Sequence, residues 1–269
     1  MTVYVITHKK FSYDLPRGYT PLLVGADYNQ HVPGYLNDNL GENISSKNKH
    51  FCELTGLYWI WKNTNDQHVG LVHYRRYFFS HDWSRHTMLL WSFIFGKTVS
   101  PISEGLLTHF LEKYDWVVGT PDTINGESLG SQYKRSHYVG DLQLAYDAIK
   151  QLYPEYLSDF DQVIYHNNKM SSFNMFYTSR KQLNKYCQWL FDILFKLEPN
   201  IKLSNRSAYQ QRVFGFLSER LFNVWLHHQK DIRVKYLSVF NTDNTNRKII
   251  FQRAVNFLLP KQQKKWFSN

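Results

Sequence analysis

The chain has 269 residues, which is enough to bury a substantial core as one large domain or two small ones. Its 43% hydrophobic and 20% charged residues are typical of an ordinary globular protein. The formal net charge of +10 indicates an anionic partner, such as nucleic acid, anionic lipid or a phosphorylated substrate.

The sequence lacks the usual marks of an exported or membrane-spanning chain. Its first residues, MTVYVITHKK, contain neither the apolar core nor the cleavage site of a signal peptide. The longest apolar stretch, Met88–Phe95, is too short to span a bilayer. Two cysteines, Cys52 and Cys187, are too few for a disulfide framework and suit a reducing compartment. We therefore expect a cytoplasmic protein.

Strands and helices are expected to alternate along the chain. In chain order we predict a strand at Thr2–Thr7, a strand at Leu22–Gly25, a loop at Tyr28–Ser46, a helix at Lys49–Asn63, a strand at His68–Val72, a helix at Glu104–Tyr114, a strand at Asp115–Gly119, a long loop at Asp122–His137, a helix at Tyr138–Leu152, a strand at Phe173–Thr178, and helices at Arg180–Leu197 and Gly215–His228. This alternation predicts an α/β fold with helices on both faces of a sheet. Ligands of such folds bind at the carboxyl ends of the strands. We expect one domain over residues 1–246 and a separate tail over residues 247–269.

The sequence GLVHYRRYF places a polar cluster directly after one predicted strand. The cluster consists of His73, Tyr74, Arg75 and Arg76, and two adjacent guanidinium groups suit the oxygens of a phosphate. Alternatively, the two arginines simply face solvent or pair with surface carboxylates.

A second candidate for anion binding is the segment NISSKNKHFCE, where a polar loop opens a helix. Backbone amides at a helix N-terminus attract anions, and Lys47 and Lys49 would reinforce that attraction. Asn48 lies between the two lysines and is a further donor-site candidate. Such a motif is weak by itself, because helix caps with flanking lysines are common.

Four blocks of sequence resemble one protein family: NISSKNKHFCELTGLYWIWKN, VGLVHYRRYF, FNMFYTSRKQLNKYCQWLFDIL and RVFGFLSERLFNVWL. The family consists of bacterial capsular and exopolysaccharide glycosyltransferases long catalogued as a domain of unknown function. The resemblance implies a GT-A-like mixed sheet with a helical C-terminal part. It also implies transfer of a sugar, with UDP-galactofuranose as the leading donor, onto a lipid-linked oligosaccharide acceptor. Acceptor-binding candidates on this basis are His137 and Asn174.

The expected metal motif of GT-A enzymes is missing from its usual place. Such enzymes hold a divalent metal with Asp-x-Asp after a central strand, but here His-Tyr-Arg-Arg follows Val72. Cations at this position could neutralise the leaving diphosphate directly, so we expect no metal cofactor, although Mn²⁺ or Mg²⁺ stays an open alternative. A literal Asp159-Phe160-Asp161 follows a helix that Pro154 interrupts, and we interpret it as a surface match.

An inverting transfer needs a carboxylate that takes the proton from the attacking hydroxyl. Asp141 and Glu219 are equal candidates, because each lies near the start of a predicted helix. Both have purely structural alternatives. Asp141 could do no more than complement a helix dipole, and Glu219 could pair with Arg212 or Arg220. His137 is a weaker candidate.

Two other functions rival that of a glycosyltransferase. A nucleic-acid-binding protein is a rival because of the charge, but the basic residues are dispersed and no known binding motif occurs, so we expect no nucleic acid. A non-catalytic polysaccharide-assembly protein is the other rival.

Residues 247–267 form a basic amphipathic segment that either docks on the core or binds an anionic membrane surface. We predict peripheral attachment at the inner face of the cytoplasmic membrane.

Overall fold

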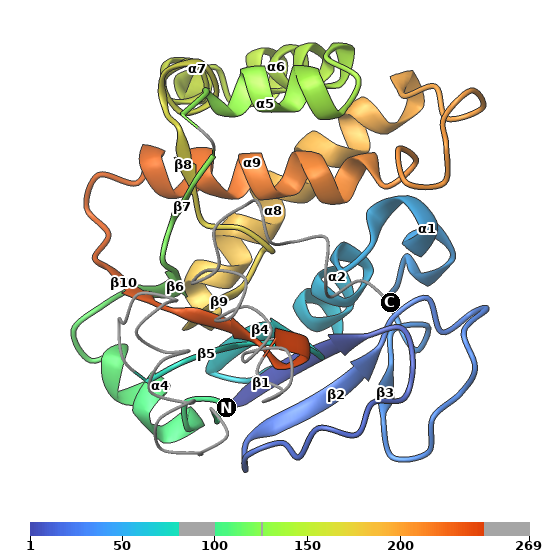
Figure 1. Cartoon of the computed structure of the whole chain (residues 1–269), viewed down its shortest axis with the longest axis vertical. Coiled ribbons are helices and arrows are strands. Elements are labelled where there is room, and N and C mark those ends of the chain that lie inside the picture. Colours follow the sequence, from blue (N-terminus) through green and yellow to red (C-terminus); the bar gives the residue numbers. More distant parts are fainter. Residues whose placement is uncertain (81–99, 125, 245–269) are drawn as a thin grey trace, which may run out of the picture.

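The computed structural model describes residues 1–80, 100–124 and 126–244. The predicted basic tail at 247–269 lies outside the described residues. The described part is built around one mixed sheet in the order β10-β6-β9-β4-β1-β2-β3 (Figure 1). Strands β1 to β4 run parallel, β9 is antiparallel to both of its neighbours, and β5 pairs with β4 and β11.

The strands are short, and most of them are buried. Their bounds are β1 (Thr2–Thr7), β2 (Tyr19–Leu23), β3 (Leu36–Asn37), β4 (His68–His73), β5 (Arg76–Phe78), β6 (Trp116–Gly119), β9 (Phe176–Ser179), β10 (Val234–Leu237) and β11 (Val239–Asn241). A separate two-stranded sheet joins β7 (Asp122–Thr123) to β8 (Lys169–Met170).

Helices cover both faces of the main sheet, as the strand–helix alternation predicts. Their bounds are α1 (Asn48–Phe51), α2 (Leu54–Asn63), α4 (Glu104–Phe110), α5 (Leu129–Ser136), α6 (Gly140–Leu152), α7 (Leu157–His166), α8 (Arg180–Leu197) and α9 (Val213–His228). In Figure 1, α2, α8 and α9 lie over one face, α5 to α7 form an outer layer beyond α9, and α4 lies on the opposite side. The expected α/β class with a mixed sheet is confirmed.

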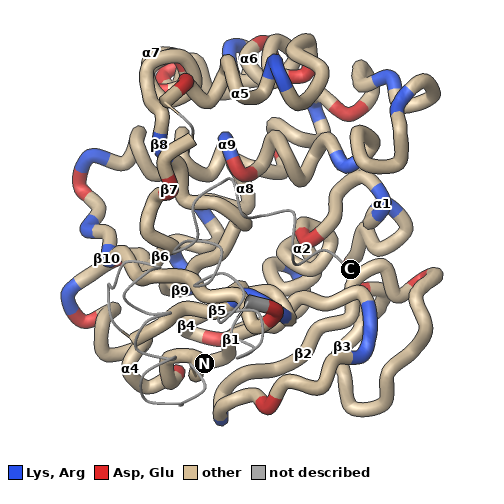
Figure 2. The backbone as a smooth tube through the Cα atoms, viewed as in Figure 1, with Lys and Arg blue, Asp and Glu red and all other residues tan. Residues whose placement is uncertain are grey.

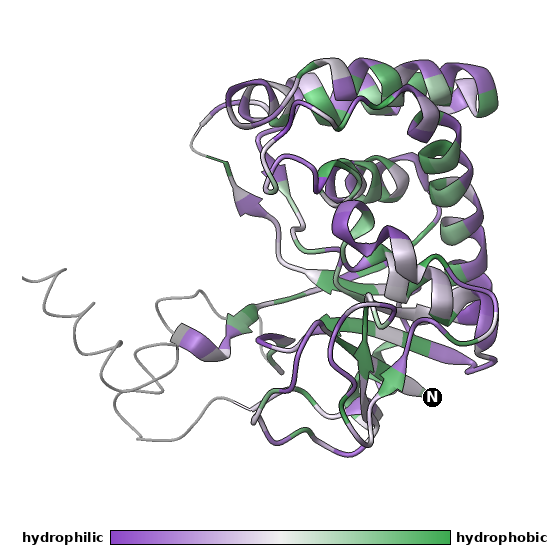
Figure 3. Ribbon diagram, turned by 90° about the vertical axis from the view of Figure 1, so that its right-hand side faces the viewer, coloured by the Kyte–Doolittle hydropathy of each residue, from purple (hydrophilic) through white to green (hydrophobic). Residues whose placement is uncertain are grey.

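Side-chain alternation along the strands divides the core between the two faces. In β1, Tyr4 and Ile6 pack with the large helical layer, whereas Val3 and Val5 pack on the α4 side. Successive residues of a strand point to opposite faces, and both faces are covered here. The strand therefore consists almost entirely of buried residues, and Figure 3 shows the strands largely in the hydrophobic colour.

The predicted helix at Lys49–Asn63 is wrong in one important detail. It is two helices, because Cys52 adopts a left-handed conformation with φ 52° and separates α1 from α2. Phe51 and Leu54 are both fully buried, so the apolar periodicity continues across the break and conceals it. The break matters for function because Cys52 and Glu53 line the pocket described below.

Three further predictions need correction. The loop expected at Asp122–His137 contains β7 and α5, so most of it is not a flap. The chain continues after Pro154 into α7, a helix that the sequence did not predict. Strands β10 and β11 were not predicted, because Val234–Leu237 and Val239–Asn241 are short and mostly half-buried.

Candidate active site

A cavity of about 780 Å³ opens where the parallel strands end, a volume typical of small-molecule sites. Thr7, Val24 and His73, at or just past the carboxyl ends of β1, β2 and β4, line one side. Residues from α5, α9 and the segment before α9 line the other side. The pocket thus lies where α/β folds usually bind ligands, as the sequence predicts.

The hairpin between β4 and β5 brings the polar cluster into this pocket. His73 and Arg76 pair across the hairpin, and Tyr74 and Arg75 form its turn. The Nη1 atom of Arg75 lies 3.3 Å from Oδ2 of Asp243, in an ion pair that is well exposed to solvent. All four predicted donor-binding residues of this cluster line the cavity.

Arg76 is the cation of the cluster that is least neutralised. Its guanidinium group lies 4.1 Å from the centre of the Phe173 ring, and within the described residues it forms no ion pair. Burial and the neighbouring charge of Arg75 lower its pKa. An unpaired, half-buried guanidinium that lines a pocket is suited to an anionic ligand.

His73 is held in one neutral tautomer. Its Nε2 atom lies 2.7 Å from the backbone oxygen of Phe173, which can only accept a hydrogen bond, so Nε2 carries the proton. Burial lowers the pKa of His73 to about 4. The imidazole is therefore neutral near pH 7 and contributes no charge to the site.

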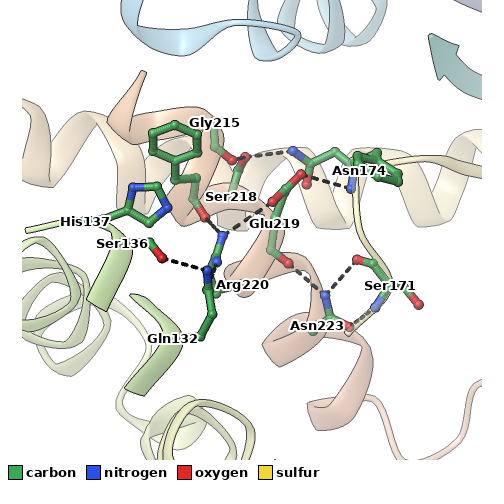
Figure 4. A network of polar contacts seen from close by, with 12 residues as sticks. Gln132, Ser136, His137, Ser171, Asn174, Gly215, Ser218, Glu219, Arg220 and Asn223 are labelled. Atoms are coloured by element: carbon green, nitrogen blue, oxygen red, sulfur yellow. Dashed lines mark hydrogen bonds and ion pairs between the residues drawn. The ribbon is translucent and has the colours of Figure 1, made fainter. Parts of the chain in front are cut away.

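The carboxylate of Glu219 lies in the floor of the pocket. Its Oε1 atom accepts a hydrogen bond of 3.0 Å from the backbone amide of Phe173, and Oε2 lies 3.4 Å from Nη1 of Arg220 (Figure 4). Burial raises the pKa of Glu219, and the nearby charge of Glu53 adds to this effect. Of the two predicted catalytic carboxylates, Glu219 is the one that lines the cavity.

Glu53 is a second pocket carboxylate, and sequence reasoning missed it. Its Oε1 atom accepts a hydrogen bond of 2.7 Å from Asn174, whose amide also donates to Ser218 at 2.8 Å. Burial raises the pKa of Glu53 as well. Glu53 is the last residue of the NISSKNKHFCE segment. The single continuous helix predicted at Lys49–Asn63 gave no indication that its side chain faces the pocket. Asn174 itself contacts Glu53 and is not among the lining residues.

Arg220 ties α5 to α9 on the helical side of the cavity. It donates to Oε1 of Gln132 at 2.6 Å and to the backbone oxygen of Phe216 at 2.9 Å (Figure 4). Next along α9, Asn223 exchanges hydrogen bonds with the backbone of Ser171. These contacts fix the helix that carries Glu219 against the loop that contains Phe173.

Two predicted site residues lie elsewhere and are fully engaged. Both oxygens of Asp141 bind Arg206, at 2.6 and 2.7 Å, in a buried ion pair outside the cavity lining. Lys47 likewise does not line the cavity, because its ammonium group binds both oxygens of Glu198 at 2.6 and 2.7 Å.

Asn48 and its surroundings close the sheet side of the cavity. Asn48 accepts a hydrogen bond of 3.2 Å from the hydroxyl of Tyr28 and donates to the backbone oxygen of Cys52 at 2.6 Å. The ammonium of Lys49 lies 5.5 Å from the centre of the Tyr28 ring. These three polar side chains therefore form one connected part of the wall.

The literal Asp-Phe-Asp sequence lies in α7, far along the chain from these strands. Both oxygens of Asp159 are bound by the Nδ1 atoms of His227 and His228, each at 2.7 Å. Across residues 1–80, 100–124 and 126–244, no group of three or more acidic, histidine or cysteine side chains is arranged to hold a metal ion.

Comparison with known proteins assigns the family. The model of a family described as a domain of unknown function, DUF4422, matches residues 2–230. The chain belongs to this family. It is also similar to a solved structure, the apo form of the bifunctional glycosyltransferase WbbM, with 28% sequence identity and a TM-score of 0.77. The match covers 90% of this chain and 45% of WbbM, so the chain spans less than half of that protein.

No curated protein matches the sequence. The α/β fold resembles a glycosyltransferase domain, in agreement with the expectation from the four sequence blocks. None of the helices in the described ranges is both long and apolar enough to cross a membrane.

Proposed function

We propose that this protein is a glycosyltransferase of polysaccharide assembly, with a nucleotide sugar as donor and a lipid-linked oligosaccharide as acceptor. UDP-galactofuranose is the leading donor, and the product is a capsular or exopolysaccharide chain. One observation carries the proposal: the cavity at the strand ends contains the unpaired cation Arg76 and the half-buried carboxylate Glu219. The similarity to WbbM supports the same class of reaction.

In this proposal the diphosphate of the donor binds the β4–β5 hairpin. Arg76 and Arg75 donate charge-assisted hydrogen bonds to phosphate oxygens, and Tyr74 and neutral His73 complete the contact surface. Asn48 lies on the same side and contributes to the nucleotide end of the site. Lys47 makes no donor contact in this proposal, since Glu198 binds its ammonium group.

The cations of the hairpin give a reason to propose a metal-independent reaction. As the bond between the sugar and the diphosphate breaks, the bonding electrons leave with the diphosphate oxygen, where negative charge develops. Arg75 and Arg76 would stabilise that charge in the way that fixed cations do at other phosphoryl leaving groups.

Glu219 is the proposed general base. It removes the proton from an acceptor hydroxyl while the hydroxyl oxygen attacks the anomeric carbon, which inverts the configuration there. A carboxylate with a raised pKa is a stronger base than an exposed one, and the amide of Phe173 holds its orientation. Asp141 is a poorer choice, because it lies outside the cavity lining and forms a buried ion pair with Arg206.

His137 lines the cavity and is proposed to contact the acceptor. Asn174 is proposed to act indirectly, because its amide is committed to Glu53 and Ser218. The catalytic domain is proposed to span residues 1–246, and the basic tail beyond it to hold the protein at the inner face of the cytoplasmic membrane.

Ligand binding and UDP release test this function. Thermal unfolding with UDP, GDP, CMP and dTDP identifies the nucleotide, since a ligand specific for the folded state raises Tm. UDP release on addition of UDP-sugars and an acceptor extract then measures transfer.

In Figure 2, Lys and Arg are spread along the described chain and interleaved with Asp and Glu, which disfavours a nucleic-acid surface. Salt-sensitive binding of RNA or DNA without any nucleotide-sugar turnover would contradict the proposal.

A further inference from the structure

The helical side of the cavity has an aromatic surface around His137. We call it the aromatic wall, and it consists of His137, Tyr209 and Phe216. The ring of His137 stacks on Phe216 with 4.1 Å between centres, and Tyr209 lies 5.0 Å from Phe216. All three rings line the cavity, yet Tyr209 is 57% exposed. The guanidinium of Arg212 also lines the cavity and lies 5.7 Å from the centre of the Phe216 ring and 6.0 Å from that of Tyr209. The wall therefore presents aromatic surface bordered by one guanidinium to whatever enters the pocket.

The position of the wall relates it to the reacting groups. Phe216 and Glu219 are three residues apart on α9, a spacing that places two side chains on the same face of a helix. Arg75 and Arg76 lie on the other side of the cavity, at the ends of the strands. A molecule on the aromatic wall would therefore lie near the proposed base and opposite the proposed diphosphate site.

Hydrogen bonding fixes which nitrogen of His137 is available. The amide nitrogen of Gln210 must donate to the backbone oxygen of Ser136, at 2.7 Å, because a carbonyl only accepts. The oxygen of the same amide therefore faces Nδ1 of His137, at 3.2 Å, and Nδ1 must carry the proton. Burial lowers the pKa of His137, which keeps the ring neutral. Its Nε2 atom is then an acceptor, and no partner for it occurs within the described ranges.

We propose that the aromatic wall is the subsite for the acceptor saccharide. A sugar ring has an apolar face of C–H groups that packs on aromatic rings, and hydroxyls at its edge that donate hydrogen bonds. The apolar face of the acceptor sugar lies on Tyr209 and Phe216, and one hydroxyl donates to Nε2 of His137. This inference rests on the proposed transferase function and adds the acceptor's position to it.

Direct binding of simple sugars tests the subsite without knowledge of the natural acceptor. The probes are the methyl glycosides of galactose, glucose, mannose and N-acetylglucosamine, measured by calorimetry with UDP present. For Tyr209→Ala we expect the affinity of the best glycoside to fall about tenfold or more, because the stacking surface is lost. Tyr209→Phe keeps the ring and should retain most of the affinity. His137→Phe keeps the stacking but removes the acceptor nitrogen, so we expect an intermediate loss.

Tyr165→Ala is the matched control, because Tyr165 is 47% exposed on α7 and does not line the cavity. It should bind glycosides and UDP as the unchanged protein does. UDP affinity of the unchanged protein, measured without a glycoside, tests the donor site by itself and so separates this inference from the transferase proposal. Failure of every glycoside to bind the unchanged protein, or equal binding by Tyr209→Ala, would overturn the subsite while leaving the donor reaction intact.

Discussion

Replacing Arg76 with glutamine should weaken diphosphate binding much more than nucleoside binding. Arg76 is the cavity-lining guanidinium of the hairpin without an ion-pair partner in the described residues, and that guanidinium packs over the ring of Phe173. Glutamine keeps part of that packing and removes the charge. The variant therefore isolates the electrostatic contact to the phosphates from the shape of the pocket.

The size of the effect follows from the bonds that are lost. Hydrogen bonds to charged groups contribute about 1.5–3 kcal/mol each. With about 1.4 kcal/mol for every tenfold change, the affinity for UDP should fall about tenfold to 150-fold. Arg75→Gln should cost less, because Asp243 lies 3.3 Å from Arg75 and already offsets part of its charge.

Calorimetric titration with UDP and with uridine gives the required comparison. Uridine lacks the phosphates, so its affinity should change little in Arg76→Gln. Arg233→Ala is the control, since Arg233 is exposed, pairs with Asp115 and does not line the cavity. If the folded Arg76→Gln protein binds UDP as well as the unchanged protein does, or loses UDP and uridine equally, the phosphate assignment is wrong.

Four further predictions concern Glu219, the metal, Glu53 and the tail. Glu219→Gln should lower the rate of sugar transfer by about a hundredfold or more. Because the base must be ionised, the acid limb of the wild-type pH–rate profile should lie above the ordinary pKa range of Glu. A near-normal rate in Glu219→Gln would remove Glu219 from the mechanism. Activity should survive EDTA, and a loss that Mn²⁺ restores would contradict the metal-free reaction. The pKa of Glu53 is raised in the folded protein, so its stabilising effect is present below the unfolded-state pKa and is lost as pH rises through the folded-state pKa. The Tm of Glu53→Gln should therefore rise relative to the wild-type Tm with increasing pH. A difference in Tm that does not change with pH would show that the pKa of Glu53 is not raised by folding. Truncation after Asn246 should abolish binding to anionic liposomes and leave UDP binding intact, whereas equal liposome binding would refute the membrane anchor.

Local sequence signals predicted the elements that form the frame of the fold. The strand at Thr2–Thr7 and the helix at Arg180–Leu197 agree with the structure residue for residue. Both have long, regular apolar patterns, and Ser179 caps the helix through its side chain. The hairpin of His73 to Arg76 was also predicted at the pocket, because polar residues directly after a buried strand must emerge at its carboxyl end.

The remainder of the site depends on contacts between distant segments, which no local pattern records. Lys47 and Asp141 looked suitable by sequence, but their partners, Glu198 and Arg206, are more than sixty residues away. Glu53 went unnoticed for the opposite reason. Its turn toward the pocket depends on Cys52, whose left-handed backbone leaves no trace in the helical periodicity.

Backbone strain is concentrated around this one cavity. In the described chain, three non-glycine residues have positive φ angles, and they are Cys52, Phe173 and Asn174. Such conformations cost about 1–3 kcal/mol each and persist where surrounding contacts hold them. Cys52 and Phe173 line the cavity, and Asn174 bonds to Glu53, which lines it.

The contacts that hold these residues are the same ones that orient the half-buried carboxylates of Glu53 and Glu219. The amide of Phe173 donates to Glu219 and its carbonyl accepts from His73, while Asn174 donates to Glu53. Neither carboxylate can therefore turn without releasing the strained turn at 173–174. If Glu219 is the base, as proposed, a carboxylate fixed in this way needs no reorientation when the acceptor hydroxyl arrives, which favours proton transfer. Burial raises the pKa of Glu219 although the hydrogen bond from Phe173 opposes that rise, so the strained backbone orients the carboxylate and burial sets its basicity.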